Sequence, residues 1–337
     1  MRVMEIEFII AAPPEAEPAQ LEQIPELRLA FANKGVQVTA APDGATGYWF
    51  TRLGVKRQSD WPAAPYRLDA AAAGDAYWLC ADPIGLQIER DRLLFDPQGP
   101  ADLSLAEAQA FIATLNTHFA PDGLQFQAPA PGQWLLRVPR VLDLAAAAPW
   151  DASGQPAALV LPRGADAAWA RRLANEAQML LHQAPANTAR EARRLPPVNS
   201  LWLWGGGRRE TAGVVSMPHA TAVASSALYL RGLAQAAGAR GVELSTSWPA
   251  TRALLGAIGA DKVLIDLTEI PQDENWINVL RANWLKPAAE PTPDENSTVW
   301  ISLLTHGLAL RTRLYHRDLF HFFGRKSLAQ YIHKRQN

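Results

Sequence analysis

The chain has 337 residues, 48% of them hydrophobic and 19% charged, which is enough to bury a sizeable core in one large domain or two ordinary ones. A net charge of −1 gives no global attraction for nucleic acid, so direct nucleic-acid binding is not expected. No uncharged run approaches the roughly 20 apolar residues of a membrane span, so no membrane segment is expected either.

Cysteine usage and the N-terminal residues indicate a reducing compartment. Cys80 is the single cysteine, so no disulfide can form within the chain. Glu5 and Glu7 interrupt the first apolar run, which argues against a signal peptide. We therefore expect a soluble, cytoplasmic protein.

The first part of the chain is predicted to combine short strands with one clear helix. Ser104 and Glu107 have capping-box spacing, and apolar residues follow on one helical face until Pro121. Strands are predicted at residues 5–10, 77–81, 86–89 and 134–138. Residues 145–162 are rich in Ala and Pro and lack periodicity. We place the boundary there, between an N-terminal α/β region, 1–145, and a C-terminal α/β region, 146–337, which could still form one continuous domain.

Strands and helices alternate more regularly in the second region. Strands are predicted at residues 201–204, 213–217, 242–244, 263–267 and 299–304, and helices at 165–183, 220–237, 250–258 and 274–285. This order predicts an α/β fold with a mostly parallel sheet and helices on both faces. Gly307 then predicts a hairpin, and the alternation over 308–314 predicts an antiparallel edge strand near the C-terminus with an arginine-bearing face.

The most informative segment is an apolar run, 201–204, that stops at Gly205, Gly206 and Gly207 and continues as Arg208 and Arg209. We interpret the glycines as a turn at a strand end, which is where open α/β sheets bind ligands. Exposed backbone N–H groups beside two guanidiniums could hold an anion. The spacing matches neither a Walker loop nor a dinucleotide-binding loop, and a purely structural turn is the alternative.

Other polar residues offer less specific patterns. His182, Asn187 and Arg190 could form a polar site or an ordinary helix end. Asp266 and Glu269 follow a predicted parallel strand, where they could be metal ligands, a general base, a helix cap or solvent-facing groups. Ser225 and Ser226 fall in a predicted helix without the glycines of a nucleophile elbow, so no nucleophile is expected there.

Four of the seven histidines occur late in the chain, as His306, His316, His321 and His333. A metal site would need two of them at short spacing with a carboxylate, and we expect none. From Leu308 to the end there are seven Lys or Arg residues and one acid. This imbalance leaves open a basic face that binds a protein partner.

Several blocks resemble the proteobacterial RpfE-type regulatory proteins. They are residues 175–182, 185–187, 189–193 and 197–205, together with 82–87 and 317–320. Members of that family are often labelled as relatives of cofactor-independent phosphoglycerate mutase. The resemblance covers most of the chain and implies a regulatory role.

A second resemblance explains that label. Residues 199–207 are similar to the Asn-x-x-Trp-x-Trp-Gly-x-Gly block of archaeal-type phosphoglycerate mutases, which belong to the alkaline-phosphatase superfamily. Residues 214–238 and 263–269 also follow the strand and helix pattern of those enzymes. The resemblance implies an alkaline-phosphatase-like core.

The chain departs from these enzymes where they hold metal. Their first strand ends in Asp-Gly, whereas this one runs from Ile9 to Pro14 without an acid. Their later strand leads into a metal cluster containing histidine, whereas residues 266–271 contain no histidine. Two-metal phosphoryl transfer needs several carboxylates and imidazoles around a nucleophile, so no metal and no other cofactor is expected.

We therefore expect a non-catalytic regulatory protein on a degenerate phosphoglycerate-mutase-like scaffold, which binds a phosphorylated small molecule or a protein partner. The predicted ligand site comprises Asn199, Trp204, Gly205, Gly206, Arg208, Arg190 and His182. The alternative is a phosphoglycerate mutase or phosphatase with rearranged ligands, which would bind divalent metal.

Overall fold

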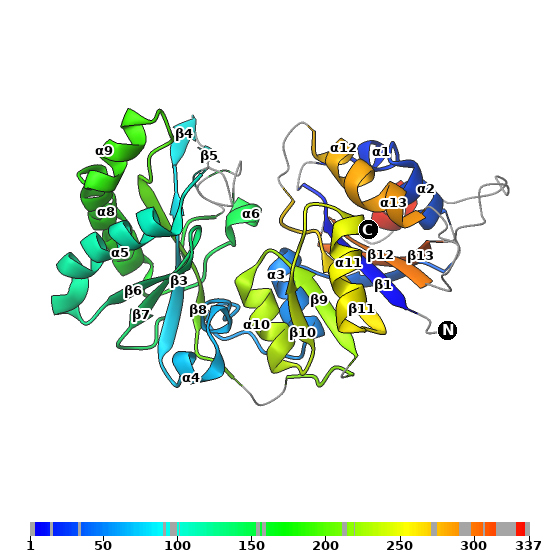
Figure 1. Ribbon diagram of the computed structural model, residues 1–337, viewed down its shortest axis with the longest axis horizontal. Helices are drawn as coiled ribbons and strands as arrows, with labels where there is room; N and C mark the ends of the chain where they lie inside the picture. The colour runs from blue at the N-terminus through cyan, green and yellow to red at the C-terminus, as the bar shows by residue number, and fades with distance from the viewer. Residues whose placement is uncertain are drawn as a thin grey trace. The chain divides into compact units, whose positions relative to one another are not determined.

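The computed structural model divides into two compact units, each assembled from separate stretches of the chain (Figure 1). The first unit is Met1–Leu53, Val215–Ala227 and Leu233–Asn337, and the second is Gly54–Val214 and Leu228–Gly232. The structure describes residues 4–13, 16–32, 35–89, 92–94, 100, 102–152, 156, 160–210, 214–218, 220–270, 275–289, 298–305, 307–314 and 328–333. The histidines 306, 316 and 321 and the block 317–320 lie outside these residues.

The first unit contains a seven-stranded sheet in the order β10-β9-β11-β1-β12-β13-β2. The strands are β1 (Glu5–Ala11), β2 (Gln37–Ala40), β9 (Thr221–Ser225), β10 (Arg240–Glu243), β11 (Lys262–Asp266), β12 (Thr298–Thr305) and β13 (Leu308–Leu314). From β10 to β12 all neighbours are parallel. This confirms the mostly parallel sheet that the alternation of elements predicts.

The antiparallel strand near the C-terminus is also confirmed, because β13 returns along β12 after Gly307, whose φ is +72°. However, β13 is not the edge. β2 pairs with its outer side and closes the sheet. The short β2 has little apolar patterning, so the sequence did not reveal it.

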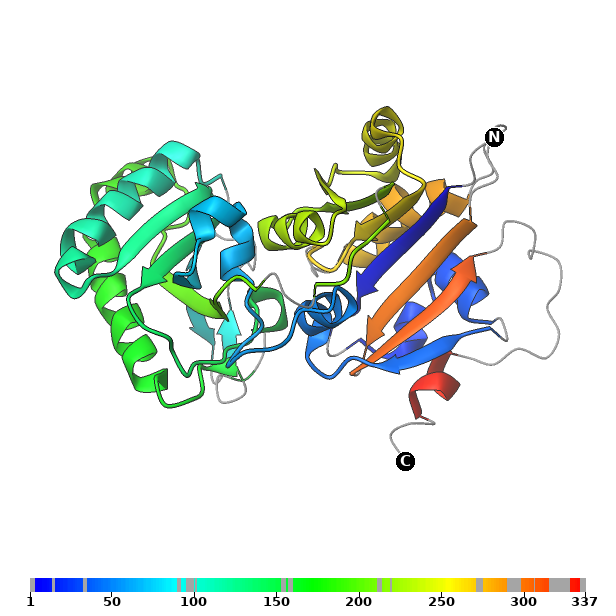
Figure 2. The same ribbon diagram turned by 90° about the horizontal axis from the view of Figure 1, so that it is seen from below.

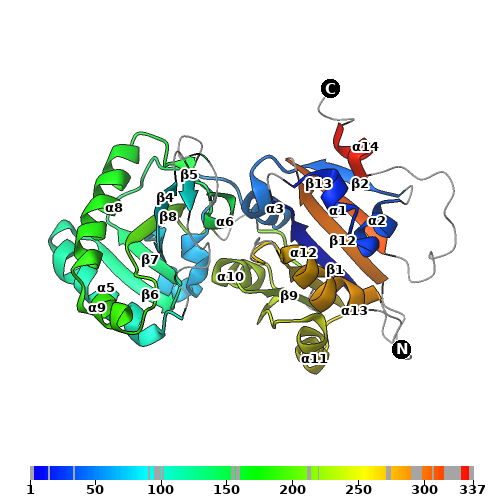
Figure 3. The same ribbon diagram turned by 90° about the horizontal axis from the view of Figure 1, so that it is seen from above.

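Helices pack against both faces of this sheet. They are α1 (Pro18–Leu21), α2 (Pro25–Phe31), α3 (Gly44–Arg52), α11 (Trp248–Ile258), α12 (Trp276–Leu280), α13 (Lys286–Ala289) and α14 (Leu328–His333), with a π-helical turn at Arg281–Leu285. Figure 3 shows α1, α2, α12 and α13 in front of the strands, whereas Figure 2 shows the opposite face, with α3 near one end. The core lies on the first face, where Phe8 packs edge-on against Trp248 at 5.4 Å between ring centroids.

The second unit is built on an antiparallel sheet of four strands in the order β6-β7-β3-β8. The strands are β3 (Tyr77–Ile84), β6 (Gln125–Ala130), β7 (Gln133–Val138) and β8 (Ser200–Gly207), and the hairpin β4 (Gln87–Glu89) and β5 (Arg92–Leu94) is separate. The main helices are α5 (Leu105–Phe119), α8 (Ala167–His182) and α9 (Pro185–Ala192), with short helices α4 (Ala70–Ala73), α6 (Pro149–Ala152), η1 (Ala64–Arg67) and η2 (Ala120–Asp122). The capping box at Ser104 and Glu107 is present as predicted.

Three predicted elements were wrong in kind. One is the strand predicted at 213–217, because the described residues 214–218 form no strand. The glycines do not form a turn, because β8 continues through Gly207 and pairs antiparallel with β3. Residues 221–225 are a strand, and the helix that was predicted from 220 begins only with α10 (Leu228–Ala236). Ala222, Val223 and Ala224 are fully buried between β10 and β11, so tertiary packing overrides the helix preference of alanine.

The boundary predicted near residue 145 lies inside the second unit. Ala145 forms an antiparallel bridge with Arg163, and Ala146 donates its N–H to Asp60. These bonds fix the Ala- and Pro-rich segment to its surroundings. Among the described residues, no helix is both long and apolar enough to cross a bilayer.

Candidate functional site

The carboxyl edge of the parallel sheet brings together the acid and hydroxyl groups of the first unit. β9 ends at Ser225 and the neighbouring β11 ends at Asp266, both fully buried. The carboxylate of Asp266 accepts four hydrogen bonds. These come from Trp49 Nε1 (3.1 Å), Ser225 Oγ (2.7 Å), Thr268 Oγ1 (2.7 Å) and the Thr268 N–H (3.3 Å).

These bonds decide what Asp266 can do. Three of these donors contact Oδ1 and one contacts Oδ2, so most of the acceptor capacity of the carboxylate is already used. Burial raises the pKa of Asp266, although its hydrogen bonds act in the opposite direction. The use of most acceptor positions and the raised pKa both favour a structural role for Asp266 over metal binding.

The other described residues at this edge do not supply a two-metal centre. β1 ends at Ala11, so no acid is present at the end of that strand. Within the part of the chain that the structure describes, no three His, Cys, Asp or Glu side chains are grouped to hold a metal. The described residues there do not fit a metal pair for phosphoryl transfer, which needs several carboxylates and imidazoles around a nucleophile.

One hydroxyl at the same edge is less buried. Ser226 follows β9, precedes α10 and donates from Oγ to Glu269 Oε2 at 3.0 Å. The sequence predicted a helix here and therefore no nucleophile. The structure instead places this serine between a strand and a helix.

The predicted arginine-bearing face of β13 points at a buried acid. Glu7 lies on β1 and accepts two bonds from Arg52, at 2.8 and 2.7 Å, and one from Ser302 at 2.6 Å. Arg311 Nε lies 3.2 Å from Glu7 Oε1. Burial alone would raise the pKa of Glu7, but these partners lower it to about 2. The Arg311 side chain therefore neutralises an internal charge.

All seven residues of the predicted ligand site lie in the second unit, and several of them make structural hydrogen bonds. The Asn199 side chain makes two bonds to the backbone of Leu86, at 2.7 and 3.0 Å. Trp204 is buried and donates to Asp82 at 2.7 Å. Gly205 has a φ of +65° and donates its N–H to Asp60 at 3.0 Å.

The sequence did not identify the acids that receive these bonds. Asp82 also accepts two bonds from Arg67, and both side chains are buried. Arg67 lies 5.4 Å from the Trp204 ring centroid, and Asp82 also accepts the Trp134 N–H at 3.0 Å. The only signal in the sequence was Asp82 itself, an acid directly after the apolar strand predicted at 77–81.

Arg190 and His182 are not brought to the same place as Arg208. Arg190 is fully buried, with Nε bonded to the Pro196 carbonyl at 2.9 Å and a guanidinium nitrogen 3.3 Å from Glu107. His182 is exposed at the end of α8. Neither residue lines the pocket that Arg208 lines.

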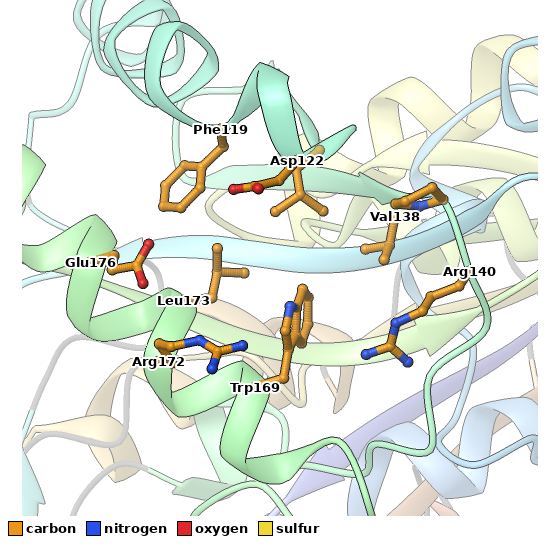
Figure 4. A pocket seen from close by; sticks show the side chains of 10 residues that line it. Phe119, Asp122, Val138, Arg140, Trp169, Arg172, Leu173 and Glu176 are labelled. Carbon is orange, nitrogen blue, oxygen red and sulfur yellow. The ribbon is translucent and has the colours of Figure 1, made fainter.

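Arg208 is exposed and lines a pocket of about 310 Å³ at the end of the four-stranded sheet. The other lining residues are Asp75, Ala76, Tyr77, Gly123, Arg137, Val138, Pro139 and Arg140. Sequence reasoning missed Arg137 and Arg140, although the first lies within the strand predicted at 134–138 and the second lies two residues after it. A second pocket of about 310 Å³ also contains Val138, Pro139 and Arg140 (Figure 4).

Comparison with known proteins places the fold. No family model matches the chain. It is 30% identical over 127 residues to a probable 2,3-bisphosphoglycerate-independent phosphoglycerate mutase of Geobacter sulfurreducens, covering 37% of this chain and 32% of the relative. It is 31% identical over 146 residues to the 2,3-bisphosphoglycerate-independent phosphoglycerate mutase of Methanothrix thermoacetophila, covering 39% and 36%. The matches therefore span about a third of these curated relatives.

Among solved structures, the PH0037 protein from Pyrococcus horikoshii has a TM-score of 0.50 at 13% identity, over 93% of this chain and 88% of that one. The sequence matches show distant homology to 2,3-bisphosphoglycerate-independent phosphoglycerate mutases over less than two fifths of this chain, and the structural likeness shows a shared α/β fold. The similarity to RpfE-type proteins remains a resemblance.

Proposed function

We propose that this distant homologue of the phosphoglycerate mutases is a non-catalytic, cytoplasmic binding protein with a regulatory role. Its ligand is a phosphorylated small molecule or a protein partner. The scaffold is retained, while the positions that would hold metal carry other chemistry.

The hydrogen bonding of Asp266, an acid at the carboxyl end of a parallel strand, supports the proposal. Its carboxylate already accepts bonds from Trp49, Ser225 and Thr268 and is fully buried. An ion that displaced these donors would leave buried polar groups unpaired, at a cost of about 1–3 kcal/mol for each group.

Metal content and mutase activity test this proposal together. The purified full chain should contain no stoichiometric divalent metal by elemental analysis. It should not interconvert 2- and 3-phosphoglycerate when Mn²⁺ or Mg²⁺ is added. The 2,3-bisphosphoglycerate-independent phosphoglycerate mutase of Methanothrix thermoacetophila serves as the positive control. Metal-dependent turnover that disappears in Asp266→Asn would refute the non-catalytic role.

The contact between Ser226 and Glu269 favours one alternative, a phosphatase or mutase with rearranged residues. A serine hydroxyl bonded to a carboxylate, just before a helix, is a suitable arrangement for a nucleophile and its base. This alternative predicts hydrolysis of a phosphate ester that Ser226→Ala abolishes and Ser216→Ala retains. Absence of hydrolysis in the unmodified chain would exclude it for the esters tested.

A further inference from the structure

We propose that the pocket lined by Arg137, Arg140 and Arg208 binds the phosphate group of a small molecule. We call it the arginine pocket. This inference rests on the proposed ligand-binding role, and it moves the site from the glycines themselves to the pocket beyond them. It also adds two arginines that the sequence did not indicate.

The glycine run brings Arg208 to this pocket. A Cβ on Gly206 would lie 2.5 Å from the Tyr77 hydroxyl, and one on Gly207 would lie 2.5 Å from Pro62 Cβ. Only residues without side chains let β8 approach these groups so closely. The strand therefore ends beside Tyr77, which lines the arginine pocket together with Arg208.

Gln58 then fixes the backbone of Arg208 on both sides. Its side-chain oxygen accepts the Arg208 N–H at 3.0 Å, and its amide nitrogen donates to the Arg208 carbonyl at 2.8 Å. The backbone is thus anchored, while the guanidinium is exposed. An anchored, solvent-facing arginine loses less conformational freedom on binding than one on a mobile loop.

Arg140 is oriented from the other side of the pocket. Its guanidinium donates to Asp166 at 2.6 Å and lies 5.7 Å from the Trp169 ring centroid. The bond to Asp166 raises the pKa of Arg140. Arginine has five donors in a planar fork, so one carboxylate partner leaves donors for an anion.

The charge balance of the arginine pocket favours an anion. Three arginines line it with one acid, Asp75, and Asp166 offsets part of the charge of Arg140. Burial raises the pKa of Tyr77, so its hydroxyl stays neutral near the pocket. Arginine forks match phosphate oxygens in geometry as well as charge.

A neighbouring pocket gives room for the organic part of such a ligand. It shares Val138, Pro139 and Arg140 with the arginine pocket and is lined by Trp169 and Leu173 as well as by charged groups. Figure 4 shows the guanidinium of Arg140 directed towards Trp169. A phosphate ester held by the arginines can therefore extend along an aromatic surface.

Titration with inorganic phosphate at constant ionic strength tests the proposal, with calorimetry on the full chain as the measurement. We expect one saturable site. Arg208→Ala and Arg137→Ala should each weaken binding roughly tenfold, since each removes a charged hydrogen-bond donor. Arg171→Ala is the matched control, because it removes the same charge from an exposed position of α8 outside both pockets.

Circular dichroism and melting temperature would show that each variant is folded. The proposal is overturned if phosphate does not bind saturably. It is equally overturned if Arg208→Ala binds like the unmodified protein, or if Arg171→Ala loses as much affinity as Arg208→Ala. None of these results bears on metal content or mutase turnover, so a failure here is distinguishable from a failure of the non-catalytic role.

Discussion

Asp60 is a buried acid whose ionised form depends on backbone donors. The N–H groups of Trp61, Ala146 and Gly205 bond its carboxylate at 2.8, 3.3 and 3.0 Å. Burial raises the pKa of Asp60 to about 6, although these bonds and the charge of Arg57 lower it. Gly205, chosen from the sequence as a ligand residue, is thus part of the environment that sets the charge of this acid.

The raised pKa predicts a dependence of stability on pH. A folded-state pKa above the unfolded value near 3.8 means that the fold prefers the protonated acid. Its contribution is therefore fully present below pH 3.8 and is lost as pH rises through about 6. One pKa unit corresponds to about 1.4 kcal/mol, so the loss is at most about 3 kcal/mol.

The measurement is urea unfolding of the unmodified chain and of Asp60→Asn at several pH values from about 4.5 to about 7.5. As pH rises, the free energy of unfolding of the unmodified chain should fall relative to that of Asp60→Asn. Taking the difference cancels other acids with shifted pKa values, such as Asp151 and Glu7. A difference that stays constant with pH would contradict the assignment to Asp60.

The pair of Arg67 and Asp82 shows why much of the site was hidden at the residue scale. The two side chains are 15 positions apart, and the bond from Trp204 to Asp82 spans 122 positions. Local spacing carries no information about such contacts. The sequence therefore identified Trp204 as special but could not show that it binds a buried acid.

Two glycines within helices differ in the space around them, and substitution by alanine is therefore expected to have opposite effects. Both lie inside helices, Gly232 in α10 and Gly256 in α11. A Cβ on Gly232 would lie 1.9 Å from the Tyr66 carbonyl oxygen, whereas a Cβ on Gly256 would have nothing within 4 Å. The first glycine is required by packing, and the second is only a weak point of its helix.

Gly232→Ala should therefore destabilise the fold by at least about 1–3 kcal/mol, because backbone must move to admit the methyl group. Gly256→Ala should stabilise it by about 0.5–1 kcal/mol, because alanine restricts the unfolded chain and favours helix. Urea unfolding of both variants measures the difference. Equal effects of the two substitutions would show that the close approach to Tyr66 is not maintained in solution.

Elements with local signals were predictable, and elements defined by distant partners were not. The helix after Ser104 has its own capping box, and α11 ends at Gly259 in the left-handed conformation. The strand 221–225 has no such signal, because its small residues suit the narrow space between two neighbours. The three glycines were predicted to form a turn, but they continue β8. They are needed there because the strand passes close to Tyr77, Pro62 and Gln58, which the local sequence does not reveal.

The whole molecule contains two hydrophobic cores, one in each unit. Phe8 belongs to the core around the seven-stranded sheet, and Phe111 belongs to the core beneath the four-stranded one. Both rings are fully buried. The fold class was predictable from the order of elements, but the boundaries were not, because the first unit returns to its sheet only after residue 214.

Substitution of these two phenylalanines tests the division directly. We expect calorimetry of the full chain to resolve two unfolding transitions, since multi-domain chains usually depart from two-state behaviour. Phe8→Ala should lower the midpoint temperature of only one transition, and Phe111→Ala that of only the other. Each substitution should reduce the free energy of unfolding of its own unit by about 3–5 kcal/mol. A boundary near residue 145 would instead put both rings in one domain. The two variants would then lower the same transition, and that result would contradict the division at Leu53 and Val215.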